Sequence, residues 1–324
     1  MSGVVTHRGG RASAKRPSQV ANEAPWVRRL LIGITTLFLG VAVVLPLSIV
    51  FASAFSKGIA PFVAALSEPE TLSAIQLTLL TAGISVPLNT VFGIAAAWLI
   101  SRYDFWGKSA LTTLIDLPFS VSPVISGLIF VLLFGAQGLF GPFLSERDIK
   151  IIFAVPGIVI ATTFVTFPLV AREVLAVMQA QGSDEEEAAL TLGAGGFQIL
   201  TRITLPKIRW GVIYGVILCN ARAMGEFGAV SVVSGHIRGQ TNTLPLHVEI
   251  LYNEYNFVGA FAVAALLASL ALITLIVRKS IEVRVALKER RLARKADADR
   301  RSLAPASLRR HDAALSARPN ESRA

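Results

Sequence analysis

The sequence has 324 residues, of which 53% are apolar and only 16% are charged, and its formal net charge is +10. A soluble globular domain carries about 45–50% apolar and about 25% charged residues, so this composition excludes a typical soluble enzyme and an intrinsically disordered chain. The single cysteine, Cys219, excludes a disulfide framework and a cysteine-rich metal site.

Six apolar segments are close to or above the roughly 18–20 residues that cross a bilayer. In chain order, we predict a basic N-terminal arm over residues 1–29, spans over 30–55, 75–100, 117–140, 151–170, 210–233 and 257–277, a loop over 171–209, and a basic, largely disordered tail over 280–324. Packed into a soluble core, six such helices would have almost no polar face. The sequence therefore predicts an all-α integral membrane protein with six transmembrane helices, in a domain over residues 30–279.

The positions of Lys and Arg predict the orientation of these spans. The N-terminal arm, the second and fourth loops and the tail together hold 26 basic residues, whereas the other three loops hold four. Cytoplasmic loops are enriched in Lys and Arg, so both termini are expected in the cytoplasm. The first apolar segment is longer than the apolar region of a signal peptide, so we expect it to be retained as the first span.

The loop between the fourth and fifth spans has the pattern of two short helices. Ser183 followed by Glu186 predicts a capping box, and the acidic residues that follow Ser183 complement the dipole of a helix N-terminus. The glycine-rich stretch 193–196 predicts a turn. A second short helix over 197–204 is expected to end at Leu205-Pro206.

This loop also carries a spaced motif. Glu187-Ala188-Ala189 is followed after three residues by Gly193, and after nine more by Ile203-Thr204-Leu205-Pro206. The pattern closely resembles the EAA loop of the membrane subunits of binding-protein-dependent ABC importers. The resemblance implies the type I importer permease (MetI-like) fold and a partner ATPase subunit that binds the loop over 183–206. The coupling residues that it implies are Glu187, Ala188, Ala189, Gly193, Ile203, Leu205 and Pro206.

The chain itself is not expected to hydrolyse ATP. Gly107-Lys108-Ser109 is the end of a P-loop pattern, but the glycine required five positions before Gly107 is replaced by Arg102. We therefore predict a non-catalytic transport subunit that binds no cofactor, with ATP and Mg²⁺ held by a separate ATPase. His7, His236, His247 and His311 are scattered and predict no metal site.

The fifth predicted span contains two charged residues, Arg222 and Glu226, which are four positions apart and so share a helix face. Two interpretations are compatible: an ion pair that fixes this helix in the bundle, and a charged face that lines a translocation path. Four glycines of this region are expected to mediate close helix packing, namely Gly211, Gly215, Gly225 and Gly228.

The stretch from Arg222 to Ala229 resembles the sulfate/molybdate branch of these permeases, as do Ser231-Val-Val-Ser-Gly235, Ile237-Arg238-Gly239, Leu244-Pro245-Leu246 and Tyr255-Asn256. This resemblance implies ATP-driven import of sulfate, and also thiosulfate, across the bacterial inner membrane. It also implies a homologous second permease subunit, two ATPase subunits and an external sulfate-binding protein. Two alternatives remain open, a permease for molybdate or another oxyanion and an ion-coupled secondary transporter.

A path for a dianion needs polar groups that hold it weakly, because a tight site would trap it. Hydroxyl, amide and guanidinium groups can donate hydrogen bonds to an oxyanion. The candidates for the path are Ser120, Ser122, Asn220, Arg222, Glu226, Ser231 and Ser234. Asp116 is expected at the membrane interface rather than in the path, because a carboxylate would repel the ion.

Overall fold

The computed structural model describes residues 25–303, and these residues form helices and connecting loops without a strand. The N-terminal arm up to residue 24 and the end of the tail, 304–324, lie outside the described residues. The described part divides into two compact units, one up to Ala52 and one from Ser53 onward. The first unit contains all but the last two residues of the helix α1 (Pro25–Ala54), which is apolar over nearly its whole length.

The second unit contains all other elements. They are α2 (Ile59–Leu66), α3 (Pro69–Arg102), α4 (Lys108–Ser120), α5 (Pro123–Phe134), α6 (Gly141–Ser145), α7 (Val155–Gln181), α8 (Asp184–Thr191), α9 (Gly196–Ile199), the π-helical turn η2 (Leu200–Thr204), α10 (Leu205–Met224), α11 (Gly228–Ser234), α12 (Leu244–Asn253) and α13 (Phe257–Leu303). In the described part of the chain, four helices are long and apolar enough to cross a membrane, or six if each of two bent helix pairs is one span.

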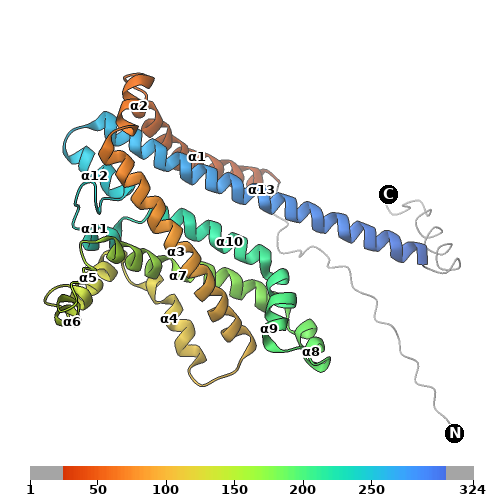
Figure 1. Ribbon diagram of the computed structural model, residues 1–324. Helices are drawn as coiled ribbons and strands as arrows, with labels where there is room; N and C mark the ends of the chain where they lie inside the picture. The colour runs from red at the N-terminus through yellow and green to blue at the C-terminus, as the bar shows by residue number, and fades with distance from the viewer. Residues whose placement is uncertain (1–24, 304–324) are drawn as a thin grey trace, which may run out of the picture. The chain divides into compact units, whose positions relative to one another are not determined.

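The centre of this unit is formed by α3, α7 and α10, which pack against one another along their lengths (Figure 1). Their contact is close because glycines replace larger residues there: a Cβ at Gly211 would lie 2.8 Å from Cγ2 of Val177, and one at Gly215 would lie 3.1 Å from the Cα of Val170. The predicted packing role of these two glycines is confirmed. Small residues of this kind let membrane helices approach closely, where van der Waals contact drives association.

Polar side chains also join these three helices. The Asn89 amide of α3 donates hydrogen bonds to Thr166 Oγ1 of α7 (2.8 Å) and to the Cys219 sulfur of α10 (3.5 Å). All three helices are therefore fixed at one level by a single buried side chain, which is 0% exposed. Such bonds are favourable in an apolar medium, which offers the amide no water as an alternative partner.

The third predicted span, over 117–140, differs from the structure. It is a bent pair of helices with other bounds: α4 begins at Lys108 and is followed by α5, which is bent from it by 109° and ends at Phe134. The bend lies at Val121 and Ser122, which have extended backbone conformations. A residue before proline is disfavoured in the α-helical region, so Pro123 ends the first helix and begins the next.

The end of the fourth predicted loop also differs. The predicted helix end at Leu205-Pro206 is wrong, because α9, η2 and α10 follow one another without a break. Pro206 is the second residue of α10 and lacks the N–H that would bond a carbonyl of the preceding turn. The wider π-helical turn precedes it, as is common where a helix accommodates a local irregularity. The last helix, α13, continues beyond the predicted span end at residue 277 to Leu303, through a stretch rich in the good helix formers Ala, Glu, Lys and Arg.

The two ends of the second unit carry different elements. The short helices α8 and α9 lie at one end, whereas α2 and α12 lie at the opposite end (Figure 1). At the latter end, α12 is fastened to the start of α3 by a hydrogen bond between His247 Nε2 and Thr71 Oγ1 (3.0 Å). A second bond runs from the N–H of Leu244 to Thr78 Oγ1 (2.9 Å).

Candidate functional site

The predicted coupling loop forms a helix, a turn and a helix. The turn after α8 is a Schellman motif, in which the N–H of Ala194 bonds the carbonyl of Ala189 and the N–H of Gly193 bonds that of Leu190. Gly193 has a φ of +85° and no atom near the place of a Cβ. Glycine is required here by the left-handed backbone, and its open outer side leaves the turn accessible.

The outward face of this loop is apolar as well as acidic. Leu192 is 88% exposed and Phe197 is 77% exposed, with Leu190 beside them, and the Glu187 carboxylate is also exposed. Exposed apolar side chains clustered around a turn are typical of a surface that contacts another protein.

The residues of the spaced motif divide into two groups in the structure. Glu187, Ala188, Gly193 and Pro206 are exposed, whereas Ala189, Ile203 and Leu205 are partly buried. Leu205 packs against the core formed by α3, α7 and α10. One part of the motif is thus available to a partner, and the other joins the loop to the membrane helices.

The predicted capping box is wrong. The Ser183 hydroxyl donates to Glu187 Oε1 (2.5 Å), and no side-chain bond caps the start of α8. Glu186 instead points inward and is 6% exposed. Its carboxylate contacts Nε of Arg102 (2.5 Å) and accepts a hydrogen bond from Thr204 Oγ1 (2.8 Å). The stronger charge-assisted contacts with Arg102 outweigh a capping bond.

The sequence-based predictions did not include this group, since Arg102 enters them only as a basic residue of the second loop and as the residue in place of a P-loop glycine. The two side chains are 84 positions apart, so no local spacing indicates the pair. The feature of the sequence that could have indicated it is the run of four acidic residues 184–187, because one carboxylate of such a run can face the protein interior while the others face solvent.

The second cluster of predicted residues lies where two bent helix pairs meet. The turn between α10 and α11 faces the turn between α4 and α5, because a Cβ on Gly228 would lie 2.9 Å from Cβ of Pro123. A Cβ on Gly127 of α5 would lie 2.7 Å from the carbonyl oxygen of Ala229 in α11. Gly228 therefore does mediate close packing, as predicted. Gly225 does not: it is exposed and its nearest neighbour is the carbonyl of Ala221 in its own helix, 3.6 Å away.

The predicted pair of Arg222 and Glu226 is confirmed, with 2.6 Å between Arg222 Nη1 and Glu226 Oε2. The Glu226 carboxylate is buried and also accepts the N–H of Ala229 (3.0 Å) at the start of α11. The Arg222 side chain is 41% exposed. The Arg222 guanidinium, partly neutralised by Glu226, is thus accessible at the junction of the helices. The Glu226 carboxylate meanwhile bonds the start of α11 and stabilises the turn between α10 and α11.

The predicted serines and Asn220 differ in accessibility. Ser120 and Ser122 are exposed at the bend between α4 and α5. Asn220 is partly buried, with its amide 3.8 Å from the sulfur of Met224. The Ser231 hydroxyl donates to the carbonyl of Gly228 (2.9 Å), within its own helix.

Ser234 is buried and bonded to neighbouring residues. It is 0% exposed, its hydroxyl accepts the N–H of His236 (3.2 Å), and its carbonyl accepts Thr241 Oγ1 (2.6 Å). Asp116, which was predicted to lie outside the path, pairs with Arg172 of α7 (2.6 Å). Among the described residues, no group of His, Cys, Asp and Glu could hold a metal ion.

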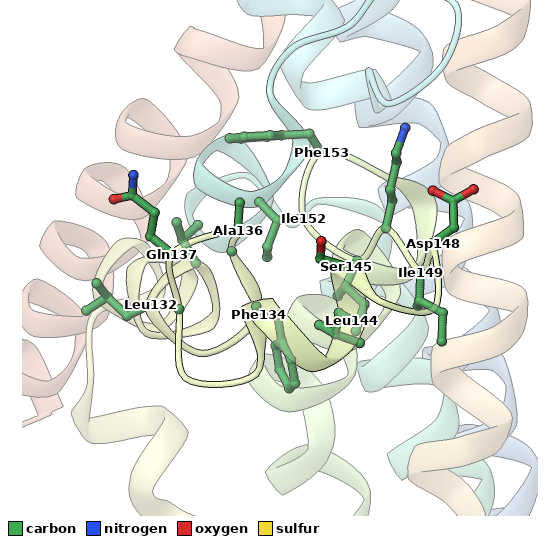
Figure 2. A pocket seen from close by; sticks show the side chains of 16 residues that line it. Leu132, Phe134, Ala136, Gln137, Leu144, Ser145, Asp148, Ile149, Ile152 and Phe153 are labelled. Carbon is green, nitrogen blue, oxygen red and sulfur yellow. The ribbon is translucent and has the colours of Figure 1, made fainter.

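A cavity of about 690 Å³ lies between the end of α5, α6 and the chain that leads to α7 (Figure 2). Its lining is mostly apolar and includes Phe134, Leu144 and Ile152, with Gln137 and Asp148 among its few polar residues. It contains none of the predicted path residues. The cavity is next to the end of α11, since the N–H of Phe153 bonds the carbonyl of Val233 (2.8 Å).

Residues 89–287 match the family described as "Binding-protein-dependent transport system inner membrane component". This range contains the loop over 183–206 and both bent helix pairs. The chain belongs to this family. It is a multi-pass membrane permease and not an enzyme, and the all-α type I importer fold predicted for it is confirmed. A solved bacterial alginate ABC transporter contains a chain with the same fold, with a TM-score of 0.67 and 19% identity over 80% of this permease and 95% of that chain.

Relatives of the permease are more similar in sequence. It is 50% identical to the sulfate transport system permease protein CysW of Escherichia coli (strain K12) over 266 residues, which are 82% of this permease and 91% of CysW. It is 34% identical to the sulfate transport system permease protein CysT of Salmonella typhimurium (strain LT2), over 76% of this permease and 89% of CysT. These relatives confirm the resemblance to sulfate permeases that the motifs indicated.

Proposed function

We propose that this permease is the membrane-spanning subunit of an ATP-driven importer that carries sulfate, and also thiosulfate, into the cytoplasm. The observation that carries the proposal is its 50% identity to the sulfate permease CysW along 91% of that protein. The bent helix pairs and the coupling loop all lie within the region that matches the family.

We further propose that residues 183–206 bind a separate ATPase, with Glu187, Ala188 and Gly193 on the contact surface. The exposed Leu192 and Phe197 support this assignment, since both flank the turn and would otherwise expose large apolar area to water. Ala189, Ile203, Leu205 and Pro206 would transmit the movement to the membrane helices. ATP and Mg²⁺ would then be held by two ATPase subunits and no cofactor by this chain.

Both termini are proposed to lie in the cytoplasm. The arrangement supports this orientation, because Arg102 at the end of α3 contacts Glu186 in α8, so the second and fourth loops lie at the same end of the permease. These are two of the segments that the distribution of Lys and Arg places on the cytoplasmic side. The other proposed partners are a CysT-like second permease and an external sulfate-binding protein.

The path is proposed to pass the junction of the two bent helix pairs, where Ser120, Ser122, Asn220 and Arg222 can donate hydrogen bonds. Ser231 would line the path, although its hydroxyl donates to the Gly228 carbonyl. Arg222 would attract the dianion, and Glu226 would keep the net charge near zero. A partly neutralised guanidinium holds an anion weakly enough to release it. Ser234 would support the wall of the path, since its groups bond neighbouring backbone and Thr241.

The test is sulfate uptake into proteoliposomes that contain this permease, its partner subunits and ATP. A Gly193→Asp variant should lose the co-purified ATPase and uptake, because a charged side chain would fill the open side of the turn. Gly195→Ala is the matched control, since Gly195 has a φ of −73° and open space for a Cβ, and it should retain both. Full assembly and uptake in Gly193→Asp would refute the coupling role, and uptake of molybdate in preference to sulfate would refute the substrate.

A further inference from the structure

The C-terminal end of α3 is tied to α8 by a buried group of polar side chains. Arg102 contacts both carboxylate oxygens of Glu186, with Nε at 2.5 Å from Oε2 and Nη2 at 3.1 Å from Oε1. The side chains are only 13% and 8% exposed, respectively. The Nη2 contact is a charge-assisted hydrogen bond and the Nε contact is an ion contact, and together they hold the guanidinium against the carboxylate.

The same group joins two further segments. Arg102 Nη2 donates to the carbonyl of Gly182 (2.8 Å), in the link between α7 and α8. Thr204 in η2, 1% exposed, donates to Glu186 Oε1. Glu186 and Arg102 thus connect the last residue of α3 with the segments before and after the exposed turn at Gly193.

We propose that Arg102 and Glu186 are positioning residues that transmit the displacement of α8 to α3. This inference rests on the proposed binding of an ATPase to residues 183–206. Apart from this group, α8 is joined to the membrane helices along the backbone, through α7 on one side and η2 on the other, and by one exposed ion pair with α10. The buried ion pair adds a direct connection to α3, which packs along α7 and α10 and therefore moves the centre of the permease with it.

A neighbouring ion pair provides a matched control. Lys207 Nζ of α10 lies 3.2 Å from Glu185 Oε1 of α8, but the Glu185 side chain is 66% exposed. This pair also joins α8 to a membrane helix and has the same charges. Because exposed pairs contribute little rigidity or free energy, it should not transmit the displacement.

The experiment measures co-purified ATPase, ATP hydrolysis and sulfate uptake in the complete reconstituted complex. Arg102→Gln/Glu186→Gln removes the ion pair without leaving an unpaired charge. Lys207→Gln, which breaks the exposed pair from a residue outside 183–206, is its control. We expect the first variant to keep its ATPase subunits and its hydrolysis while the sulfate transported per ATP falls by about fivefold, a typical effect of mutations that change coupling. The control should stay near wild type.

An additional variant, Arg102→Lys, keeps the charge but loses the fork-shaped donor group. It should fold and show an intermediate ratio of sulfate to ATP. The proposal is overturned if the double variant transports as much sulfate per ATP as wild type, or if it loses its ATPase subunits, since the pair would then serve assembly. If the wild-type permease binds no ATPase, the proposed function itself fails, and that outcome is separate from both.

Discussion

The ion pair of Arg222 and Glu226 is unequally exposed, so removal of either partner should have a different effect on stability. Glu226 is 2% exposed, whereas the Arg222 side chain is 41% exposed. Arg222→Gln leaves a buried carboxylate that retains the N–H of Ala229. Glu226→Gln leaves a guanidinium that water can still reach.

The magnitudes follow from these environments. Removing one partner of a buried ion pair costs about 3–5 kcal/mol, because the other charge is left buried and unpaired. Arg222→Gln should fall at the lower end, about 3 kcal/mol, since the bond from Ala229 partly stabilises the carboxylate. Glu226→Gln should cost about 1–2 kcal/mol. This cost is the loss of an ion pair whose arginine is partly exposed, together with the weakening of the hydrogen bond from the Ala229 N–H. The double variant leaves no unpaired charge and should therefore be more stable than Arg222→Gln alone.

The measurement is reversible unfolding of the purified complex in mixed micelles, with both single variants and the double variant forming a thermodynamic cycle. Asp116→Asn and Arg172→Gln provide a control pair at the same 2.6 Å separation, with side chains 35% and 54% exposed. Their costs should be small and nearly equal. A Glu226→Gln variant as unstable as Arg222→Gln, or less stable than it, would refute the reasoning from exposure.

Two further predictions concern other parts of the fold. Burial lowers the pKa of His247 below its usual 6.5, despite opposing nearby acidic groups, and the neutral ring bonds Thr71. As pH falls, the ring of the unfolded chain therefore takes up a proton at a higher pH than the ring of the folded protein. The free energy of unfolding should decrease as pH falls from about 6.5 toward the lowered pKa. Thermal unfolding measured between those pH values should show a flatter pH dependence for His247→Gln. Gly127→Ala should lower the free energy of unfolding by about 1–3 kcal/mol, because the new Cβ would meet the Ala229 carbonyl. Gly83→Ala is the control, since the space around Gly83 is open, and it should leave the free energy of unfolding unchanged or slightly higher. Equal effects of the two substitutions would contradict the packing argument.

The sequence alone was sufficient for several features that depend on neighbouring residues. Apolar runs indicated the membrane helices, since their length and hydropathy are local properties. The motif around Gly193 indicated the family, and the four-residue spacing of Arg222 and Glu226 indicated their pair because a helix has 3.6 residues per turn.

Only the tertiary structure decided which distant segments meet. The contact of Glu186 with Arg102 replaced the local capping box predicted from Ser183, because a buried carboxylate near a guanidinium gains more than it does at an exposed helix start. The approach of Gly228 to Pro123 likewise depends on the 109° and 51° bends of two separate helix pairs. Such angles and pairings arise from the packing of whole helices, so no short stretch of sequence contains them.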